Sequence, residues 1–133
     1  MKQWMARALP LLLLGLTPLS SLAQTKTTEV ASCYLPGVQE QLHCGTVSVP
    51  ENYDQPEGKH IGIYYAVLPA VQEGAKAEPM LILAGGPGQA ATELAPMIAR
   101  MFEGVRQKRD ILLIDQRGTG KSHPLKCDIE RPD

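Results

Sequence analysis

The pattern of apolar and polar positions divides the chain into two structural parts, and the first is a pair of strands. From Ile61 to Val67, apolar side chains recur at every second position, which is the period of a β-strand with two unlike faces. The segment Leu42 to Val49 is also rich in β-forming residues and is ended by Pro50. Asn52 to Gly58, between the two segments, suits a turn. The pattern therefore predicts two antiparallel strands.

The second part has the pattern of a strand, a helix and a further strand. Met80 to Ala84 and Ile111 to Ile114 are unbroken apolar runs, typical of strands that are buried on both faces. Between them, apolar residues recur at helical spacing from Leu94 to Val105, and Pro96 is tolerated if it lies in the first helical turn. A right-handed crossover places both strands parallel in one sheet, with the helix on one face. We predict the N-terminal portion of an α/β fold.

The opposite face of this sheet has no second long amphipathic helix to cover it within these 133 residues. Apolar strands exposed to water in this way are rarely tolerated. We therefore expect the fold to be incomplete and the polypeptide to continue beyond Asp133.

The N-terminal residues have the pattern of an export signal. Basic residues precede the apolar run Ala8 to Leu16, and small residues follow up to Ala23. The run is shorter than the roughly 20 residues that a membrane helix needs. We predict a signal peptide over residues 1–23, a flexible lead-in over 24–32 and a folded domain over 33–133. The mature protein would be periplasmic or secreted, without a stable membrane anchor.

Cysteine usage and charge narrow the possible partners. In an oxidising compartment Cys33 and Cys44 are close enough in sequence to form a disulfide, which is worth about 3 kcal/mol. Cys127 is then left over, and its partner would lie on another chain or on a part of the protein outside this sequence. A metal site is the weaker alternative, because no C-x-x-C is present. The formal net charge of -1, without a basic run, argues against nucleic acid as a partner.

The loop Gly85-Gly86-Pro87-Gly88 lies between a predicted strand and a predicted helix. Main-chain N–H groups at such a position are unpaired and can bind a negatively charged group. One hypothesis is a tight turn. A second is a dinucleotide site, since Gly86-x-Gly88-x-x-Ala91 has the required spacing and Asp115 ends the next strand. Pro87 removes an N–H from such a loop, which argues against the second hypothesis. The third is an oxyanion hole, which stabilises a tetrahedral intermediate.

A resemblance to a known family favours the third hypothesis. The glycine loop, the run Asp115-Gln116-Arg117-Gly118-Thr119-Gly120-Lys121-Ser122 and the lead-in Cys44-Gly45-Thr46-Val47-x-Val49-Pro50 resemble the prolyl and tripeptidyl aminopeptidase branch of the α/β-hydrolases. The resemblance covers roughly Cys33 to Cys127. It implies an α/β-hydrolase fold, an acyl-serine mechanism without a cofactor and a peptide or small ester substrate. That family commonly has His-Gly-Gly-Pro-Gly, whereas Ala84 stands in the histidine position here.

The same resemblance implies roles for individual residues. Gly86 would supply a main-chain oxyanion donor, with Gly85 in the same loop. The residues expected to shape the site are Pro87, Gly88, Asp115, Arg117, Gly118 and Gly120. Asp115 and Arg117 would tie the loop by a charged hydrogen bond. The run ending in Lys121-Ser122 does not fit a phosphate-binding P-loop, because Asp115 stands where that motif needs glycine.

A nucleophile is not evident in the 133 residues. The elbow G-x-S-x-G is absent, and Ser122-His123 are sequence neighbours, which rarely place their side chains for mutual proton transfer. His43 and His60 are expected at the surface. We therefore expect this chain alone to be inactive. We expect the whole enzyme to be an aminopeptidase that releases N-terminal residues or short peptides. The alternatives are a dinucleotide-binding protein and an esterase of the same fold.

Overall fold

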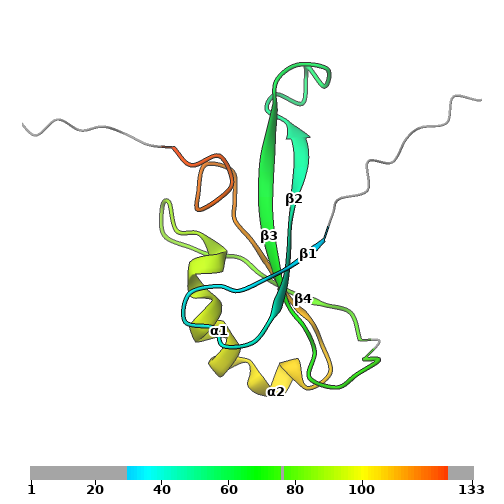
Figure 1. Cartoon of the computed structure of the whole chain (residues 1–133). Helices are drawn as coiled ribbons and strands as arrows, with labels where there is room; N and C mark the ends of the chain where they lie inside the picture. Colours follow the sequence, from blue (N-terminus) through cyan, green and yellow to red (C-terminus); the bar gives the residue numbers. More distant parts are fainter. Residues whose placement is uncertain (1–29, 76, 126–133) are drawn as a thin grey trace, which may run out of the picture.

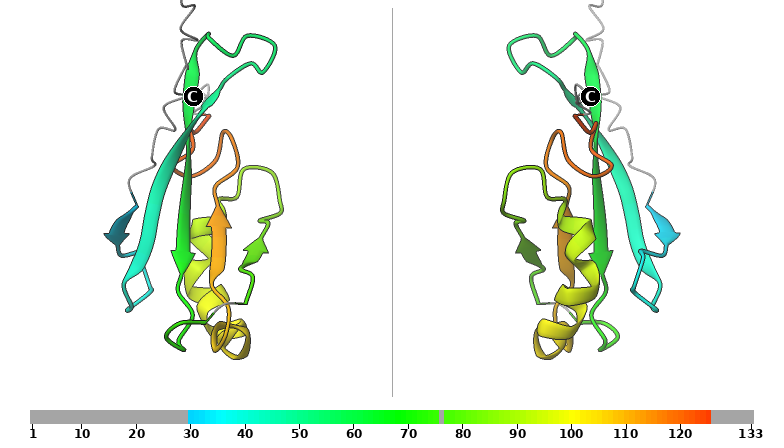
Figure 2. Two further views of the ribbon diagram at one scale, coloured as in Figure 1. Left: turned by 90° about the vertical axis from the view of Figure 1, so that its right-hand side faces the viewer. Right: turned by 90° about the vertical axis from the view of Figure 1, so that its left-hand side faces the viewer.

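The computed structural model describes residues 30–75 and 77–125, and a five-stranded mixed sheet lies at its centre, in the order β1-β2-β3-β5-β4. Figure 2 shows the strands fanned across this sheet. The observed sheet agrees with a partial α/β fold. The strands are β1 Ala31–Cys33, β2 Leu42–Pro50, β3 His60–Leu68, β4 Met80–Ile82 and β5 Ile111–Ile114.

The antiparallel pair predicted from the alternating pattern is confirmed. β2 pairs with β3 in a register that runs from His43 opposite Val67 to Pro50 opposite His60. The two strands form the long hairpin at the top of Figure 1. At its tip the Glu51 N–H donates to the Lys59 carbonyl at 2.7 Å, and the two side chains form an exposed ion pair at 2.9 Å.

The predicted strand-helix-strand unit is also confirmed, with changes at its ends. β4 lies parallel to β5, with Met80 opposite Ile111. β4 ends at Ile82 instead of Ala84, because it is an edge strand with one neighbour, and Leu83 beyond it is 70% exposed. The connection between these strands is helical, as the apolar spacing predicts.

The helical connection is divided into three short pieces, whereas the pattern predicts one helix. A 3-10 turn η1 (Ala91–Leu94) leads into α1 (Ala95–Met101), and α2 (Glu103–Arg106) follows after a break at Phe102. Pro96 lies in the first turn of α1, as expected. Because proline has no N–H and crowds the preceding turn, the α-helix does not extend back through η1. Gly104, a weak helix former, follows the break.

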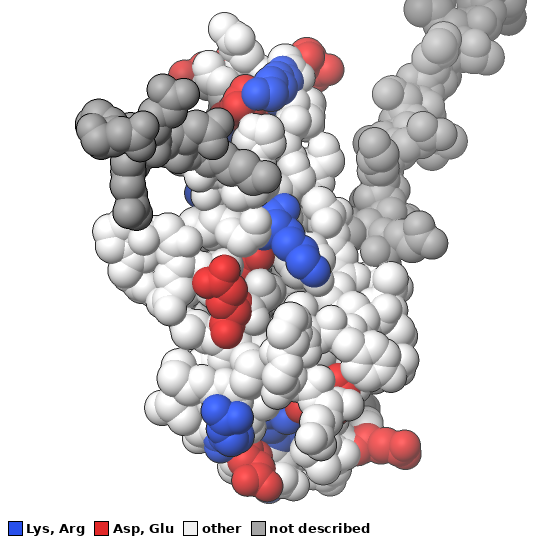
Figure 3. Space-filling model, turned by 60° about the vertical axis from the view of Figure 1, so that its left-hand side comes forward, with Lys and Arg blue, Asp and Glu red and all other residues white. Residues whose placement is uncertain are grey.

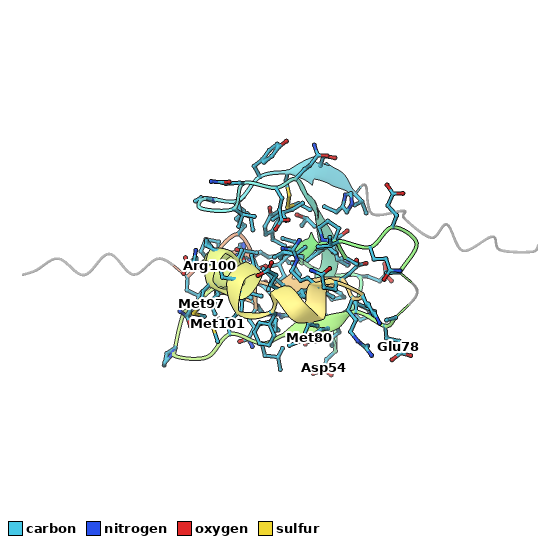
Figure 4. The ribbon with its side chains drawn as sticks, turned by 90° about the horizontal axis from the view of Figure 1, so that it is seen from below. Asp54, Glu78, Met80, Met97, Arg100 and Met101 are labelled. Atoms are coloured by element: carbon cyan, nitrogen blue, oxygen red, sulfur yellow. A yellow bond between two sulfur atoms is a disulfide. The ribbon has the colours of Figure 1, made fainter. Side chains whose placement is uncertain are left out.

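One face of the sheet carries the helices and the hydrophobic core. Figure 2 shows α1 and α2 on the same side of the strands. Ile98 of α1 is buried against the sheet, whereas Met97 and Met101 are exposed and gather with Arg100 on one side of the helix (Figure 4). The fully buried side chains at the centre include Leu42, Leu68, Ile111 and Leu113.

The opposite face of the sheet is apolar, and no element within residues 30–75 and 77–125 covers it. A shallow hollow of about 260 Å³ lies on this face, and Leu81 on β4 is 49% exposed. The hollow is lined by Val47, Ile63, Tyr65, Leu112 and Ile114. The prediction that the helix covers only one face is thus confirmed for the described residues.

The N-terminal strand begins earlier than expected. β1 starts at Ala31 and pairs with β2, so sheet structure begins inside the segment 24–32 that the sequence predicts to be a flexible lead-in. Pairing with the first residues of β2, Leu42 to Cys44, accounts for this difference. The predicted disulfide between Cys33 and Cys44 is present and joins the two strands, with their Cα atoms 5.9 Å apart.

The predicted signal peptide over residues 1–23, the rest of the lead-in up to residue 29, and Cys127 lie outside the described residues. Within the part of the chain that is described, no helix is long and apolar enough to cross a membrane.

Candidate active site

The two glycine-containing motifs lie at the same end of the sheet. β4 and β5 are parallel neighbours, so the loops that follow their carboxyl ends emerge at one edge. Figure 1 shows the loop after β4 and the loop after β5 above the N-terminal end of α1. The carboxyl ends of parallel strands are where α/β proteins bind ligands. The fold therefore brings together two segments that are separated in the sequence by a helical connection and by β5.

The loop after β4 contains a turn that needs glycine at two positions. The Gln89 N–H donates to the Gly86 carbonyl at 3.2 Å, and φ is +81° at Gly86 and +86° at Gly88. Residues with a side chain rarely adopt these values. Gly85 does not have a positive φ, so it is not required for the turn.

Open space lies beside the glycines of this loop. A Cβ atom added at Gly85, Gly86 or Gly88 would meet no atom within 4 Å. Within residues 30–75 and 77–125 the Gly86 N–H donates no hydrogen bond. A main-chain donor beside unfilled space can stabilise a negative oxygen, which is the chemistry of an oxyanion hole.

Asp115 connects this loop to the one after β5. It is completely buried, and its carboxylate accepts hydrogen bonds of 3.0 Å from the Thr92 N–H, the Thr92 hydroxyl and the Lys121 N–H. Gly120 has a φ of +47°, and a Cβ atom there would collide with the Asp115 carboxylate and with Ala90. A buried carboxylate whose oxygens both accept hydrogen bonds from the protein is poorly placed to bind a ribose, which argues against the dinucleotide hypothesis.

Arg117 attaches the loop after β5 to the β2–β3 hairpin. Its guanidinium donates to the carbonyl of Glu51 and, at 3.1 Å, to that of Pro50, and it lies 5.5 Å from the centre of the Tyr53 ring. Asp115 and Arg117 therefore both tie the loop, but through separate partners instead of through one bond between them. Gly118, with a φ of +84°, closes the turn by donating to the Ser122 carbonyl at 2.8 Å.

Ser122 is structural in this arrangement. Its side chain is completely buried, and its Oγ accepts a hydrogen bond from the Tyr64 N–H at 2.7 Å. The neighbouring His123 is exposed and has a φ of +52°. This environment suits an anchor for the loop and not a nucleophile that must reach a substrate. His43 and His60 are exposed, as the sequence predicts.

Charged groups near the site are dispersed. Figure 3 shows separate basic and acidic side chains on this side of the molecule, without a continuous basic surface. The hydrogen bond from Lys59 lowers the pKa of the Glu51 carboxyl from its ordinary value. Among the described residues, no three His, Cys, Asp or Glu side chains form a group that could hold a metal ion.

Thr92 is a residue of the site that was not predicted from the sequence. A threonine just ahead of a helical stretch is a recognised capping signal, and that signal could have drawn attention to it. A capping hydroxyl accepts from a helix N–H, whereas the Thr92 hydroxyl donates to the Asp115 carboxylate, 23 residues away. The role of Thr92 depends on a long-range contact that its local sequence does not contain.

Known proteins similar to this chain are hydrolases. No family model matches the chain. Over 87 residues it is 37% identical to a putative hydrolase of Mycobacterium bovis and to Carboxylesterase B of Mycobacterium tuberculosis, covering 63% of this chain and 16% of each relative. Over 82 residues it is 32% identical to Serine protease Hip1 of Mycobacterium tuberculosis, covering 61% of this chain and 15% of that protein.

The chain thus spans less than a fifth of the length of these relatives. The similarity supports a serine hydrolase at a coarse level and suggests a fragment of an α/β-hydrolase fold. Since both an esterase and a protease are among the relatives, it does not separate ester from peptide substrates.

Proposed function

We propose that this chain supplies the oxyanion loop of an exported serine hydrolase, and that the whole enzyme is an aminopeptidase. The observation that carries the proposal is the Gly86 N–H, which donates no hydrogen bond within residues 30–75 and 77–125 and belongs to an open loop that follows β4 and is tied to the buried Asp115. The hydrolase relatives support the reaction class. The Cys33–Cys44 disulfide supports export, because disulfides persist in oxidising compartments.

In the proposed mechanism a serine attacks the carbonyl carbon of the substrate, and negative charge develops on the carbonyl oxygen. The Gly86 N–H donates to that oxygen, and a second donor comes from the residue after the nucleophile. The acyl-serine that results is hydrolysed by water. The 133 residues contain no G-x-S-x-G. The chain therefore contributes half of an oxyanion hole and no nucleophile.

The isolated chain is expected to be catalytically inactive. Purified protein should show no covalent labelling by a fluorophosphonate probe and no hydrolysis of p-nitrophenyl acetate or alanyl-p-nitroanilide, because Ser122 is buried and bound to Tyr64. Labelling of one site per chain, mapped by mass spectrometry, would show that a nucleophile is present and would refute this part of the proposal.

Changing Gly86 to alanine should impair catalysis in the enzyme expressed from the complete reading frame that contains these residues. Alanine is strained at a φ of +81°, so the N–H moves, and we expect kcat to fall roughly tenfold to a hundredfold with little change in KM. Gly85→Ala is the matched control, since Gly85 does not have a positive φ and a Cβ atom there would meet nothing within 4 Å. Equal losses in both variants would contradict the role of Gly86.

Assays of the same enzyme with two kinds of substrate distinguish an aminopeptidase from an esterase. An aminopeptidase hydrolyses alanyl-p-nitroanilide with a free amine and rejects its N-acetylated form. Carboxylesterase B among the relatives favours an esterase as the second candidate. Faster turnover of p-nitrophenyl esters, with no activity on either anilide, would support that candidate instead.

A further inference from the structure

Contacts made by the flanking residues, and not by the loop itself, determine the position of the oxyanion loop. Apart from the adjoining residues, no described atom lies within 4 Å of a Cβ placed at Gly85, Gly86 or Gly88, and residues 85–89 are exposed, so the loop has little packing of its own. It is therefore held at its two ends. One end is β4, and the other is the segment Ala90 to Thr92, in which Ala90 and Ala91 are completely buried.

The second end carries the stronger attachment. The buried Asp115 carboxylate binds Thr92 twice, one oxygen accepting from its N–H and the other from its hydroxyl. The second oxygen also accepts from the Lys121 N–H. Hydrogen bonds to a carboxylate are stronger than those between neutral groups, and two bonds to one residue fix its orientation as well as its distance.

We propose that Thr92 and Asp115 are positioning residues that hold the Gly86 N–H where it can donate to the reacting carbonyl oxygen. This inference rests on the proposed function. Only Pro87, Gly88 and Gln89 separate Gly86 from the buried Ala90, and the Gly86–Gln89 hydrogen bond links the turn to this anchored segment. A shift at Thr92 is therefore transmitted to Gly86 over a short distance.

The arrangement leaves little room for adjustment. Gly120 approaches both the Asp115 carboxylate and Ala90 so closely that a methyl group cannot fit between them. Asp115 is itself fixed by its N–H, which donates to the Tyr64 carbonyl at 3.0 Å in the sheet. The sheet thus determines where Asp115 lies, and Asp115 determines where the loop ends.

Two substitutions at Thr92 test this inference in the chain itself. Thr92→Val removes the hydroxyl while keeping the shape, whereas Thr92→Ser keeps both donors. By NMR hydrogen exchange we expect the amides of residues 89, 92 and 121 to exchange about tenfold faster in Thr92→Val. Thr92→Ser should match the wild type. Glu40→Gln, which weakens the remote Arg106–Glu40 ion pair, should leave these amides unchanged.

The second measurement is kinetic and uses the enzyme from the complete reading frame. Thr92→Val should lower kcat about tenfold with KM unchanged, and Thr92→Ser should restore it. An active wild type whose kcat is unaffected by Thr92→Val would overturn the inference, as would unchanged exchange at residues 89 and 92. An inactive wild type with the expected exchange pattern would instead refute the proposed function.

Discussion

Replacing Gly120 with alanine is expected to lower the free energy of unfolding by about 3 kcal/mol. The added methyl group would collide with the Asp115 carboxylate and with Ala90, which are both completely buried. Overpacking of this kind typically costs about 1–3 kcal/mol, and the left-handed backbone at φ +47° adds strain for alanine. Urea denaturation followed by circular dichroism measures the change.

Gly74→Ala separates the collision from the backbone strain. Gly74 also has a positive φ, +71°, but a Cβ atom there would meet nothing within 4 Å. This control should therefore cost only about 1 kcal/mol. If both variants lose the same stability, close packing of Gly120 against Asp115 does not contribute, and the arrangement around the carboxylate is looser than described.

Removing the disulfide is expected to cost about 3 kcal/mol. The bridge closes a loop between cysteines 11 residues apart, and it restricts the unfolded chain while joining β1 to β2. β1 has only three residues and pairs with one neighbour, so it depends on this bond more than the other strands do. The double variant Cys33→Ala/Cys44→Ala should unfold at correspondingly lower urea concentration.

Reductant provides the control for the disulfide. Dithiothreitol should lower the stability of the wild type to about that of the double variant and leave the double variant unchanged. A wild type that is insensitive to dithiothreitol, with the bond shown to be reduced by mass spectrometry, would contradict the stabilising role.

Local sequence patterns predicted most of the described sheet. Alternation from Ile61 to Val67 placed β3, and the unbroken run Ile111 to Ile114 coincides with β5. These signals are local because the apolar pattern lies within each strand. They do not fix which face is covered, since Ile63 and Tyr65 of β3 line the uncovered face and Ala66 is buried. The early end of β4 and the early start of β1 were not predictable in this way, since strand ends depend on which neighbour is present to pair with them.

The glycine-containing turns at the candidate site were predicted from the sequence, whereas the oxyanion role of Gly86 stays a prediction. Positive φ at Gly86, Gly88 and Gly118 agrees with the emphasis on these motifs. Asp115 and Arg117 were expected to tie the loop, but their partners were not foreseen, because Thr92 binds Asp115 and Arg117 binds the hairpin across 23 and 66 positions. A positive φ can be predicted from the sequence because it favours glycine at that position. Distant hydrogen-bond partners cannot be predicted in this way, because they come together only when the sheet has formed.

The uncovered apolar face of the sheet has a thermodynamic consequence for the isolated chain. The heat capacity of unfolding is set by the apolar surface that becomes hydrated when the fold is lost. Around Val47, Tyr65 and Leu112 part of that surface is already in contact with water before unfolding begins. The stability curve of this chain is therefore flatter against temperature than that of a closed domain of equal length.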